Sequence, residues 1–105
     1  MPYMAQYDPM KVIRSSEFEL WLSLQTVKME LLIESRIFRI IHYDHFGDAR
    51  YLGSQLSELR WDNGLRVYLT KLENRLVLIL SAGLKNAQKK DIKKARILLQ
   101  RYTNS

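Results

Sequence analysis

The sequence predicts a single α+β domain with an N-terminal helical hairpin, a small antiparallel sheet and a C-terminal helix. Three observations predict this. Apolar residues recur at helical spacing in the N-terminal half, two strands meet at a tight turn, and an unbroken apolar run occupies 76–80. The 105 residues have the length of one domain, so 1–105 is treated as one unit. Residues 1–9 show no periodicity and are expected to form a flexible arm.

The helical hairpin is expected between Ser16 and Ile41, after a short first strand at Met10–Arg14. Ser16 and Glu19 have the spacing of a capping box, which predicts a helix start near Ser16. A second helical pattern runs from 26 to 41. Its stripe is expected to combine Val27, Leu31 and Phe38 with Ile33, Ile37, Ile40 and Ile41.

The turn Asp62-Asn63-Gly64 sets the register of the two strands that it joins. Asn-Gly tolerates the positive φ values of a hairpin turn. A two-residue loop would place Trp61 opposite Arg66 and mix polar with apolar side chains on both faces. A three-residue loop places Arg60 opposite Arg66 and keeps one face apolar, so we prefer it.

In this register Arg60 and Arg66 are directly opposed, with Cβ atoms roughly 5 Å apart. Like charges in that position repel each other. An anion between them would relieve the conflict, and the planar guanidinium suits phosphate. The alternative is a solvated face on which Glu58 is the local counter-charge. The hairpin alone leaves both interpretations open.

The C-terminal part predicts one buried strand and one basic helix. Residues 75–82 are apolar on both faces, which is typical of a central strand covered on both sides. The segment 83–90 is rich in lysine, and 91–102 has helical spacing. The buried stripe of this helix is expected to comprise Ile92, Ala95, Leu99 and Tyr102.

The charge is concentrated in the C-terminal half. Residues 1–53 hold 6 Lys and Arg against 7 Asp and Glu, a net charge of −1. Residues 54–105 hold 11 against 4, a net charge of +7, which gives +6 for the chain. A basic half attracts polyanions and raises their encounter rate. Nucleic acid, the ribosome or an acidic protein would all fit.

Other features narrow the class of protein. The chain has no cysteine, which favours a reducing compartment and excludes thiolate metal sites. No apolar run is long enough to span a bilayer, and the N-terminus lacks the apolar core of a signal peptide. A cytoplasmic protein without membrane contact is expected. His42 and His45, with two nearby aspartates, are interpreted as a helix cap and a surface residue, so no metal or cofactor is expected.

Several short strings resemble a known family in their order and spacing. They are Phe46-Gly47-Asp48, Leu52-Gly53, Ser57-Glu58-Leu59-Arg60, Arg66-Val67-Tyr68, and a segment from Gly83 through Lys85, Gln88 and Asp91 to Ala95. From about residue 16 to 102 the chain is similar to the addiction module killer group of the RelE/ParE superfamily of bacterial type II toxins, often labelled HigB-like.

The resemblance implies a helical hairpin on a curved antiparallel sheet. RelE-like members cleave mRNA, usually in the ribosomal A site, whereas ParE-like members inhibit DNA gyrase. Both are neutralised by an antitoxin encoded beside them. In this group the antitoxin usually carries a helix-turn-helix domain, and the complex binds operator DNA. The expected function is therefore a ribosome-dependent mRNA endoribonuclease. The alternatives are a gyrase inhibitor and an inactive antitoxin-binding relative.

The RelE-like reaction requires a base, an acid and cations around one phosphate, because the ribose 2′-OH attacks it and a 5′-OH leaves. The resemblance assigns the phosphate to Arg60 and Arg66. Many relatives carry a Tyr or His near the start of the terminal segment, which this chain lacks. Lys85 and Lys71 are therefore the candidates for proton transfer. The residues expected to hold RNA backbone are Lys89, Lys90, Lys93 and Lys94.

Overall fold

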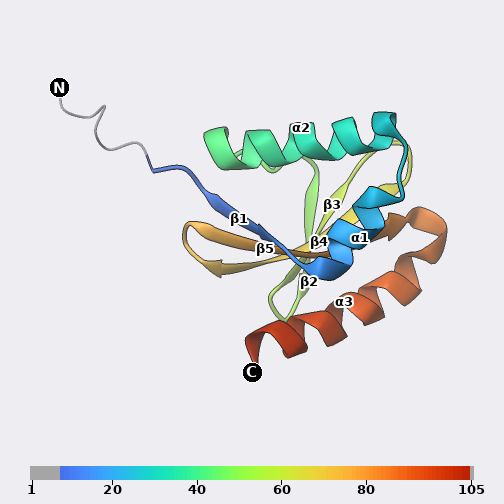
Figure 1. Ribbon diagram of the computed structural model, residues 1–105. Helices are drawn as coiled ribbons and strands as arrows, with labels where there is room; N and C mark the ends of the chain where they lie inside the picture. Colours follow the sequence, from blue (N-terminus) through green and yellow to red (C-terminus); the bar gives the residue numbers. More distant parts are fainter. Residues whose placement is uncertain (1–7, 105) are drawn as a thin grey trace.

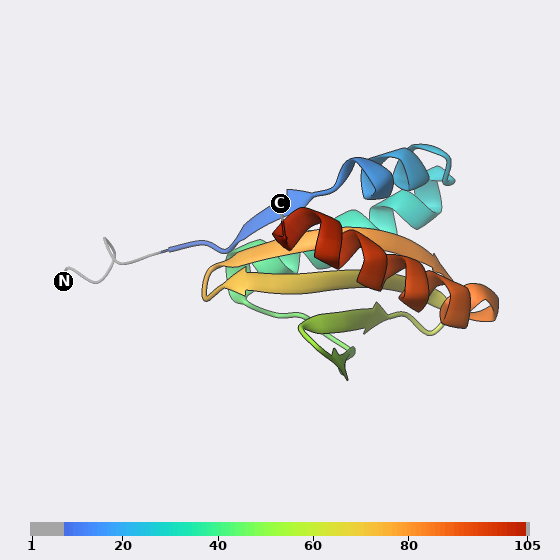
Figure 2. The ribbon, with the colours of Figure 1, turned by 90° about the horizontal axis from the view of Figure 1, so that it is seen from below.

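The computed structural model describes residues 8–104, so most of the expected arm at 1–9 lies outside the described part. Three layers make up the fold: two helices, a sheet, and a third helix on the opposite face (Figures 1 and 2). The elements are β1 (Lys11–Arg14), α1 (Ser16–Ser23), α2 (Val27–Tyr43), β2 (Ala49–Gly53), β3 (Leu56–Arg60), β4 (Leu65–Glu73), β5 (Leu76–Leu84), the 3-10 turn η2 (Lys85–Ala87) and α3 (Gln88–Thr103).

The sheet has five strands in the order β1-β5-β4-β3-β2. The four strands β2 to β5 are antiparallel neighbours, and β1 lies parallel to β5 at one edge. The predicted α+β class, with a helical hairpin and a C-terminal helix, is confirmed. The structure adds two details, the parallel edge and the strand β2. No helix in the described part of the chain is long and apolar enough to cross a membrane.

The predicted register of the central hairpin is confirmed. Arg60 lies opposite Arg66, with Glu58 opposite Tyr68. The loop has three residues, because Trp61 N donates to the carbonyl of residue 65 at 3.1 Å. Gly64 has a φ of +95°, which an L side chain rarely adopts. The choice of the register that keeps one face apolar therefore gave the observed pairing.

Two cores lie on the two faces of the sheet. On one face, side chains of α1 and α2 such as Phe18, Ile33 and Ile40 pack on Leu59 and Val67. On the other face, α3 packs on the sheet. That second core comprises Leu56, Tyr68, Leu78, Leu80, Ala95, Leu98 and Leu99. The strand β5 is covered on both sides, as its apolar sequence predicted.

Three details of the helices differ from the sequence expectations. The cap of α1 is Ser15 rather than Ser16, since Ser15 Oγ accepts from Phe18 N at 3.0 Å. Tyr102 is 39% exposed instead of buried, and its hydroxyl donates to Glu17. Leu98, which lay off the expected stripe, is buried against the sheet. In α3 the buried face is therefore turned toward Leu98 and away from Tyr102.

The outer face of α2 is apolar but exposed, contrary to the single stripe expected. Val27, Leu31 and Phe38 are 71%, 62% and 54% exposed. The helix lies on the sheet through Ile33, Ile37, Ile40 and, unexpectedly, Arg36. The four-residue steps between apolar residues describe two stripes on opposite sides of the helix, and only one of them contacts the core.

Candidate functional site

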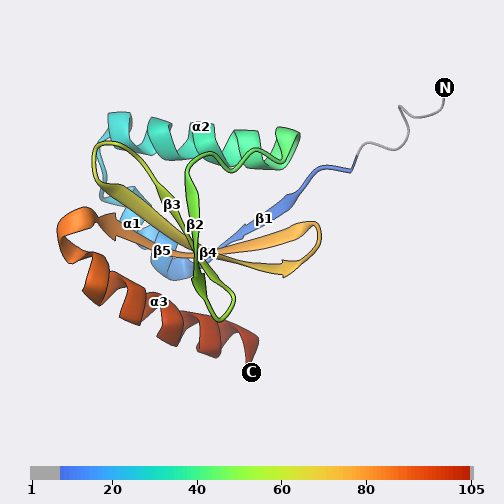
Figure 3. The ribbon, with the colours of Figure 1, turned by 180° about the vertical axis from the view of Figure 1, so that it is seen from behind.

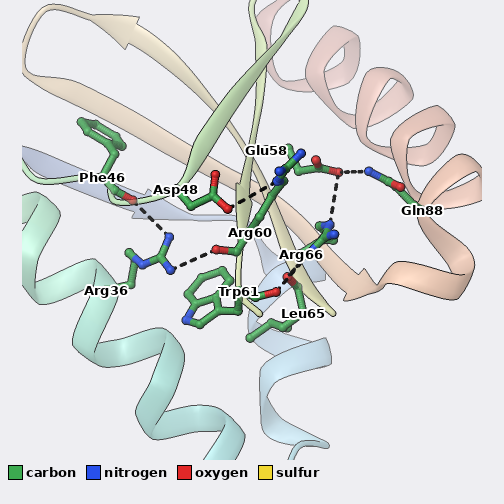
Figure 4. Close-up of polar contacts among 9 residues, drawn as sticks. All are labelled: Arg36, Phe46, Asp48, Glu58, Arg60, Trp61, Leu65, Arg66 and Gln88. Atoms are coloured by element: carbon green, nitrogen blue, oxygen red, sulfur yellow. Dashed lines mark hydrogen bonds and ion pairs between the residues drawn. The ribbon is translucent and has the colours of Figure 1, made fainter. Parts of the chain in front are cut away.

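The candidate site lies on the sheet face beneath the start of α3, where the arginine pair is found (Figure 4). Side chains alternate along a strand, so Glu58 and Arg60 of β3 share one face with Arg66 and Tyr68 of β4. This is the face that carries α3, because Tyr68 belongs to the α3 core. The sheet thus presents a polar half next to the apolar half that anchors the helix.

Arg66 is the buried member of the pair. Its Nη1 donates to the carbonyl of Leu65 at 3.0 Å and to that of Trp61 at 3.3 Å. Its Nε lies 4.0 Å from Glu58 Oε2. Glu58 has no exposed surface, and the same oxygen accepts from Gln88 Nε2 at 2.7 Å. Arg66 is therefore held inside the protein by its own hairpin and by a buried carboxylate.

Arg60 is the accessible member of the pair. Its side chain is 33% exposed, and its Nε lies 3.5 Å from Asp48 Oδ2. The two opposed guanidinium groups are therefore balanced by separate carboxylates, Asp48 for Arg60 and Glu58 for Arg66. The opposed pair and the Glu58 counter-charge are both observed, but the expected alternative of a solvated face is wrong, because Glu58 is completely buried and Arg66 is only 9% exposed. Only Arg60 is positioned to meet an incoming anion from solvent.

Tyr68 and Glu58 lie beside the pair, and both are fully buried. Burial and the neighbouring Glu58 carboxylate raise the pKa of Tyr68 well above its usual value, so its phenol stays protonated at neutral pH. The sequence interpretation missed Tyr68, although the predicted register placed it directly across from Glu58. In this conformation neither group can contact a substrate.

Lys85 lies beside the hairpin turn. Its backbone N donates to the carbonyl of Gly64 at 2.7 Å, which ties the start of η2 to the turn. Together with Asp62, Asn63, Leu84 and Asn86, these two residues line a shallow depression of about 330 Å³. Gly83, two residues earlier, is the strand partner of Arg66. Lys85 therefore flanks the arginine pair on its turn side, with an exposed side chain.

Lys71 lies away from the arginine pair. It is five residues along β4 from Arg66, which corresponds to roughly 16 Å of strand. Its Nζ lies 4.6 Å from the ring centroid of Phe46, a residue that packs on the α1 and α2 core. Lys71 is thus on the other face of the sheet. The structure pairs Arg60 with Arg66, places Lys85 at the adjoining turn, and does not bring Lys71 to them.

The four lysines of α3 are exposed and fall on two flanks. Lys89, Lys93 and Arg96 recur at i, i+4 and i+7, so they share one flank. Arg96 donates to the carbonyls of residues 52 and 53 at 2.9 and 3.2 Å, which turns this flank toward the β2–β3 hairpin (Figure 3). Lys90 and Lys94 lie on the flank of Asp91. Lys89 and Lys93 therefore lie on the flank of α3 that faces the β2–β3 side of the sheet, and Arg60 belongs to β3.

The start of α3 approaches β5 closely at Asp91. A Cβ atom on Gly83 would lie 2.8 Å from Asp91 Cγ, inside the normal contact distance. Burial raises the pKa of the Asp91 carboxyl, and Lys94 and Lys90 oppose that shift. Gly83 thus permits the start of α3 to lie close to β5. No group of three or more His, Asp or Glu among residues 8–104 has the geometry of a metal site.

Arg36 of α2 reaches the same strand end from the opposite face (Figure 4). Its Nη1 donates to the Phe46 carbonyl and its Nη2 to the Arg60 carbonyl, both at 3.1 Å. Its guanidinium lies 4.0 Å from the centroid of the Trp61 ring. Burial lowers its pKa from the usual range. The sequence did carry a signal, since Arg36 is spaced by three and four residues from Ile33 and Ile40 on the buried stripe.

Comparison of this fold with solved structures defines its class. A mutant E. coli RelE toxin in the free state superposes with a TM-score of 0.67 over 86% of this chain and 96% of that chain, at 8% identity. The RelBE2 toxin–antitoxin complex of Mycobacterium tuberculosis gives 0.61 over 73% and 99%, at 14% identity. Isolated E. coli RelE gives 0.61 over 81% and 97%, at 8% identity. The chain has the RelE fold.

Sequence similarity then places the chain in a family. No family model matches it. An uncharacterized protein of Haemophilus influenzae is 40% identical over 86 residues, which cover 79% of this chain and 86% of the relative. The chain belongs to the same protein family as this Haemophilus influenzae protein.

Proposed function

We propose that this protein is the toxin of a type II toxin–antitoxin system, of the HigB-like group, and that it inhibits translation by cleaving mRNA on the ribosome. The RelE fold supports the toxin assignment. The observation that carries the nuclease assignment is Arg60. It is a partly exposed guanidinium beside a buried charge pair, in a chain whose C-terminal helix carries exposed lysines.

In the proposed reaction the scissile phosphate binds Arg60. The ribose 2′-OH attacks the adjacent phosphorus, the 5′-oxygen leaves with a proton, and a 2′,3′-cyclic phosphate forms. Arg60 stabilises the charge that develops on the phosphate oxygens. Arg66 supplies a second positive charge from its buried position beside Arg60. Of the two candidate lysines, Lys85 is the better placed for proton transfer, because Lys71 lies on the other sheet face.

The α3 lysines hold the RNA backbone in this proposal, with Lys89 and Lys93 nearest to the Arg60 side and Lys90 and Lys94 on the outer flank. The partners are the mRNA in the ribosome and a helix-turn-helix antitoxin encoded beside the toxin gene. Operator DNA is bound through that antitoxin. The reaction requires neither a metal nor another cofactor, and it takes place in the cytoplasm.

A second candidate is a ParE-like toxin that inhibits DNA gyrase without nuclease activity, or an inactive relative that only binds the antitoxin. One observation favours this alternative. The carboxyl of Glu58 and the phenol of Tyr68, next to the arginine pair, are both fully buried. A gyrase inhibitor needs a basic surface but no exposed acid or base.

Induced expression with and without the neighbouring antitoxin gene tests the proposal. We expect growth arrest that the antitoxin relieves, and new mRNA 5′ ends at discrete positions in translated frames. Arg60→Ala should abolish both. Arg39→Ala, an exposed arginine on the outer side of α2, is the matched control and should retain both. Growth arrest with intact mRNA and gyrase-cleaved plasmid would replace the proposal by the second candidate, and no arrest at all would favour the inactive relative.

A further inference from the structure

We infer that Arg36 is a positioning residue for the Arg60 anion site, and that it acts from the opposite face of the sheet. The inference rests on the proposed function, because it assigns a purpose to the geometry around Arg60. Arg36 belongs to α2, whereas Arg60 is the last residue of β3. The link between them is a hydrogen bond to the Arg60 main chain, so it leaves the Arg60 side chain free for a ligand.

The burial of Arg36 carries a desolvation cost, which lowers the stability of the fold. The residue is only 8% exposed, among the isoleucines that bind α2 to the sheet. Within residues 8–104 it forms no ion pair with a carboxylate. A buried cation without such a partner loses hydration that its hydrogen bonds replace only in part. An apolar side chain would avoid that cost, but it would leave the carbonyls of Phe46 and Arg60 without their guanidinium donor.

The two acceptors of Arg36 explain why a guanidinium occupies this position. They come from two different segments that meet at the site. The Phe46 carbonyl belongs to the loop between α2 and β2, and the Arg60 carbonyl ends β3. Two residues beyond Phe46, the Asp48 carbonyl accepts from Arg60 N at 2.9 Å. The Asp48 carboxylate lies 3.5 Å from Arg60 Nε. One guanidinium therefore fixes both the backbone of Arg60 and the loop that carries its carboxylate partner.

The guanidinium occupies a slot that admits a flat group. The Trp61 ring lies 4.0 Å from its central carbon on one side. A Cβ atom on Gly47 would lie 3.1 Å from three guanidinium atoms, and Gly47 has a φ of +73°. A lysine ammonium could replace the charge but not the planar, two-pronged donation to carbonyls in different segments. The slot thus predicts that Arg36→Lys is not a conservative change.

Loss of this link should misplace Arg60 without removing it. Small displacements of a catalytic group can cost about 100-fold in rate. The RNA contacts on α3 remain, so affinity for RNA should change little. The expected signature is a lower rate of the chemical step at nearly unchanged binding, together with an altered environment of the Arg60 guanidinium.

The experiment compares Arg36→Lys and Arg36→Met with Arg39→Met, the exposed neighbour on the same helix. Four quantities are measured: the fraction folded by urea titration, the rate of single-turnover cleavage of mRNA on programmed ribosomes, the affinity for a labelled RNA oligonucleotide, and the ¹H–¹⁵N resonance of Arg60 Nε. We expect both Arg36 variants to fold, to cleave at least about 10-fold more slowly with RNA affinity changed less than about 3-fold, and to shift or broaden the Arg60 resonance. Arg39→Met should match the wild type in all four.

Two results would overturn the inference. One is an Arg60 resonance identical to the wild type in the folded Arg36 variants. The other is that both variants unfold where Arg39→Met is folded, which would make Arg36 a residue of the fold alone. If the wild type cleaves no RNA, the proposed nuclease function fails, whereas the resonance still reports whether Arg36 positions Arg60. The two failures are therefore distinguishable.

Discussion

Substitution of Arg66 by methionine separates the structural member of the arginine pair from the ligand-binding member. The Arg66 side chain is 11% exposed, and its partner Glu58 is completely buried. Arg66→Met would leave the Glu58 carboxylate buried without a cation, with a hydrogen bond from Gln88. Removal of one partner from a buried charge pair costs about 3–5 kcal/mol. Arg60→Met removes a pair whose side chains are 33% and 57% exposed, which contributes about 0–1 kcal/mol.

Urea unfolding at neutral pH, followed by circular dichroism, measures both changes. A domain of this size has a total stability of roughly 5–15 kcal/mol, so the loss in Arg66→Met should be a large fraction of it. The double variant Arg66→Met/Glu58→Leu removes both charges and should recover most of the loss. Arg60→Met should unfold near the wild-type midpoint.

The division of roles between the arginines is refuted by either of two outcomes. One is a loss of less than about 1 kcal/mol in Arg66→Met, the level of an exposed pair. The other is a double variant that is no more stable than Arg66→Met alone. Either result would mean that Glu58 and Arg66 are not energetically coupled in the folded protein.

Three further predictions concern the frame around the site. Gly83→Ala should destabilise the protein by about 1–3 kcal/mol in urea unfolding through its clash with Asp91, and Asp91→Ala in the same chain should restore part of the loss. Arg14 lowers the pKa of Glu34 below its ordinary value of 4.5, so their link stabilises the fold above that pH and is lost as the pH falls through the lowered value. Glu34→Gln should therefore flatten the loss of stability on acidification, as followed by urea titrations across that range. Leu31→Lys should change the unfolding free energy by less than about 0.5 kcal/mol, because this side chain is 62% exposed; a loss of several kcal/mol would contradict the assignment of the outer face of α2.

The sequence predicted the features that depend on neighbouring residues. The turn at 62–64 permits one register that keeps an apolar face, and that register is observed. The opposition of Arg60 and Arg66, and the identity of Glu58 as counter-charge, followed from it. The apolar run of β5 likewise predicted a strand covered on both sides. Each of these features depends on residues within one hairpin or one strand.

The remaining features depend on how distant segments meet. The periodicity of α2 fits two stripes, and only the packed fold shows that Val27 and Leu31 face away from the sheet. Nothing in the local pattern of β1 indicates that it runs parallel to β5. Arg36 lies in an apolar stripe, but its acceptors on Phe46 and Arg60 come from other elements. The role of such a residue can be assigned only when the packing of the helix on the sheet is known.

In the proposed reaction, Arg60 stabilises the scissile phosphate during RNA cleavage. The most direct measurement is single-turnover cleavage of mRNA on programmed ribosomes by purified wild type and Arg60→Ala, with analysis of the product ends. We expect 2′,3′-cyclic phosphate and 5′-hydroxyl ends from the wild type, and a rate at least about 100-fold lower in the variant at unchanged stability. An equal cleavage rate in Arg60→Ala would contradict the role proposed for Arg60. No cleavage by the wild type would contradict the proposed nuclease function.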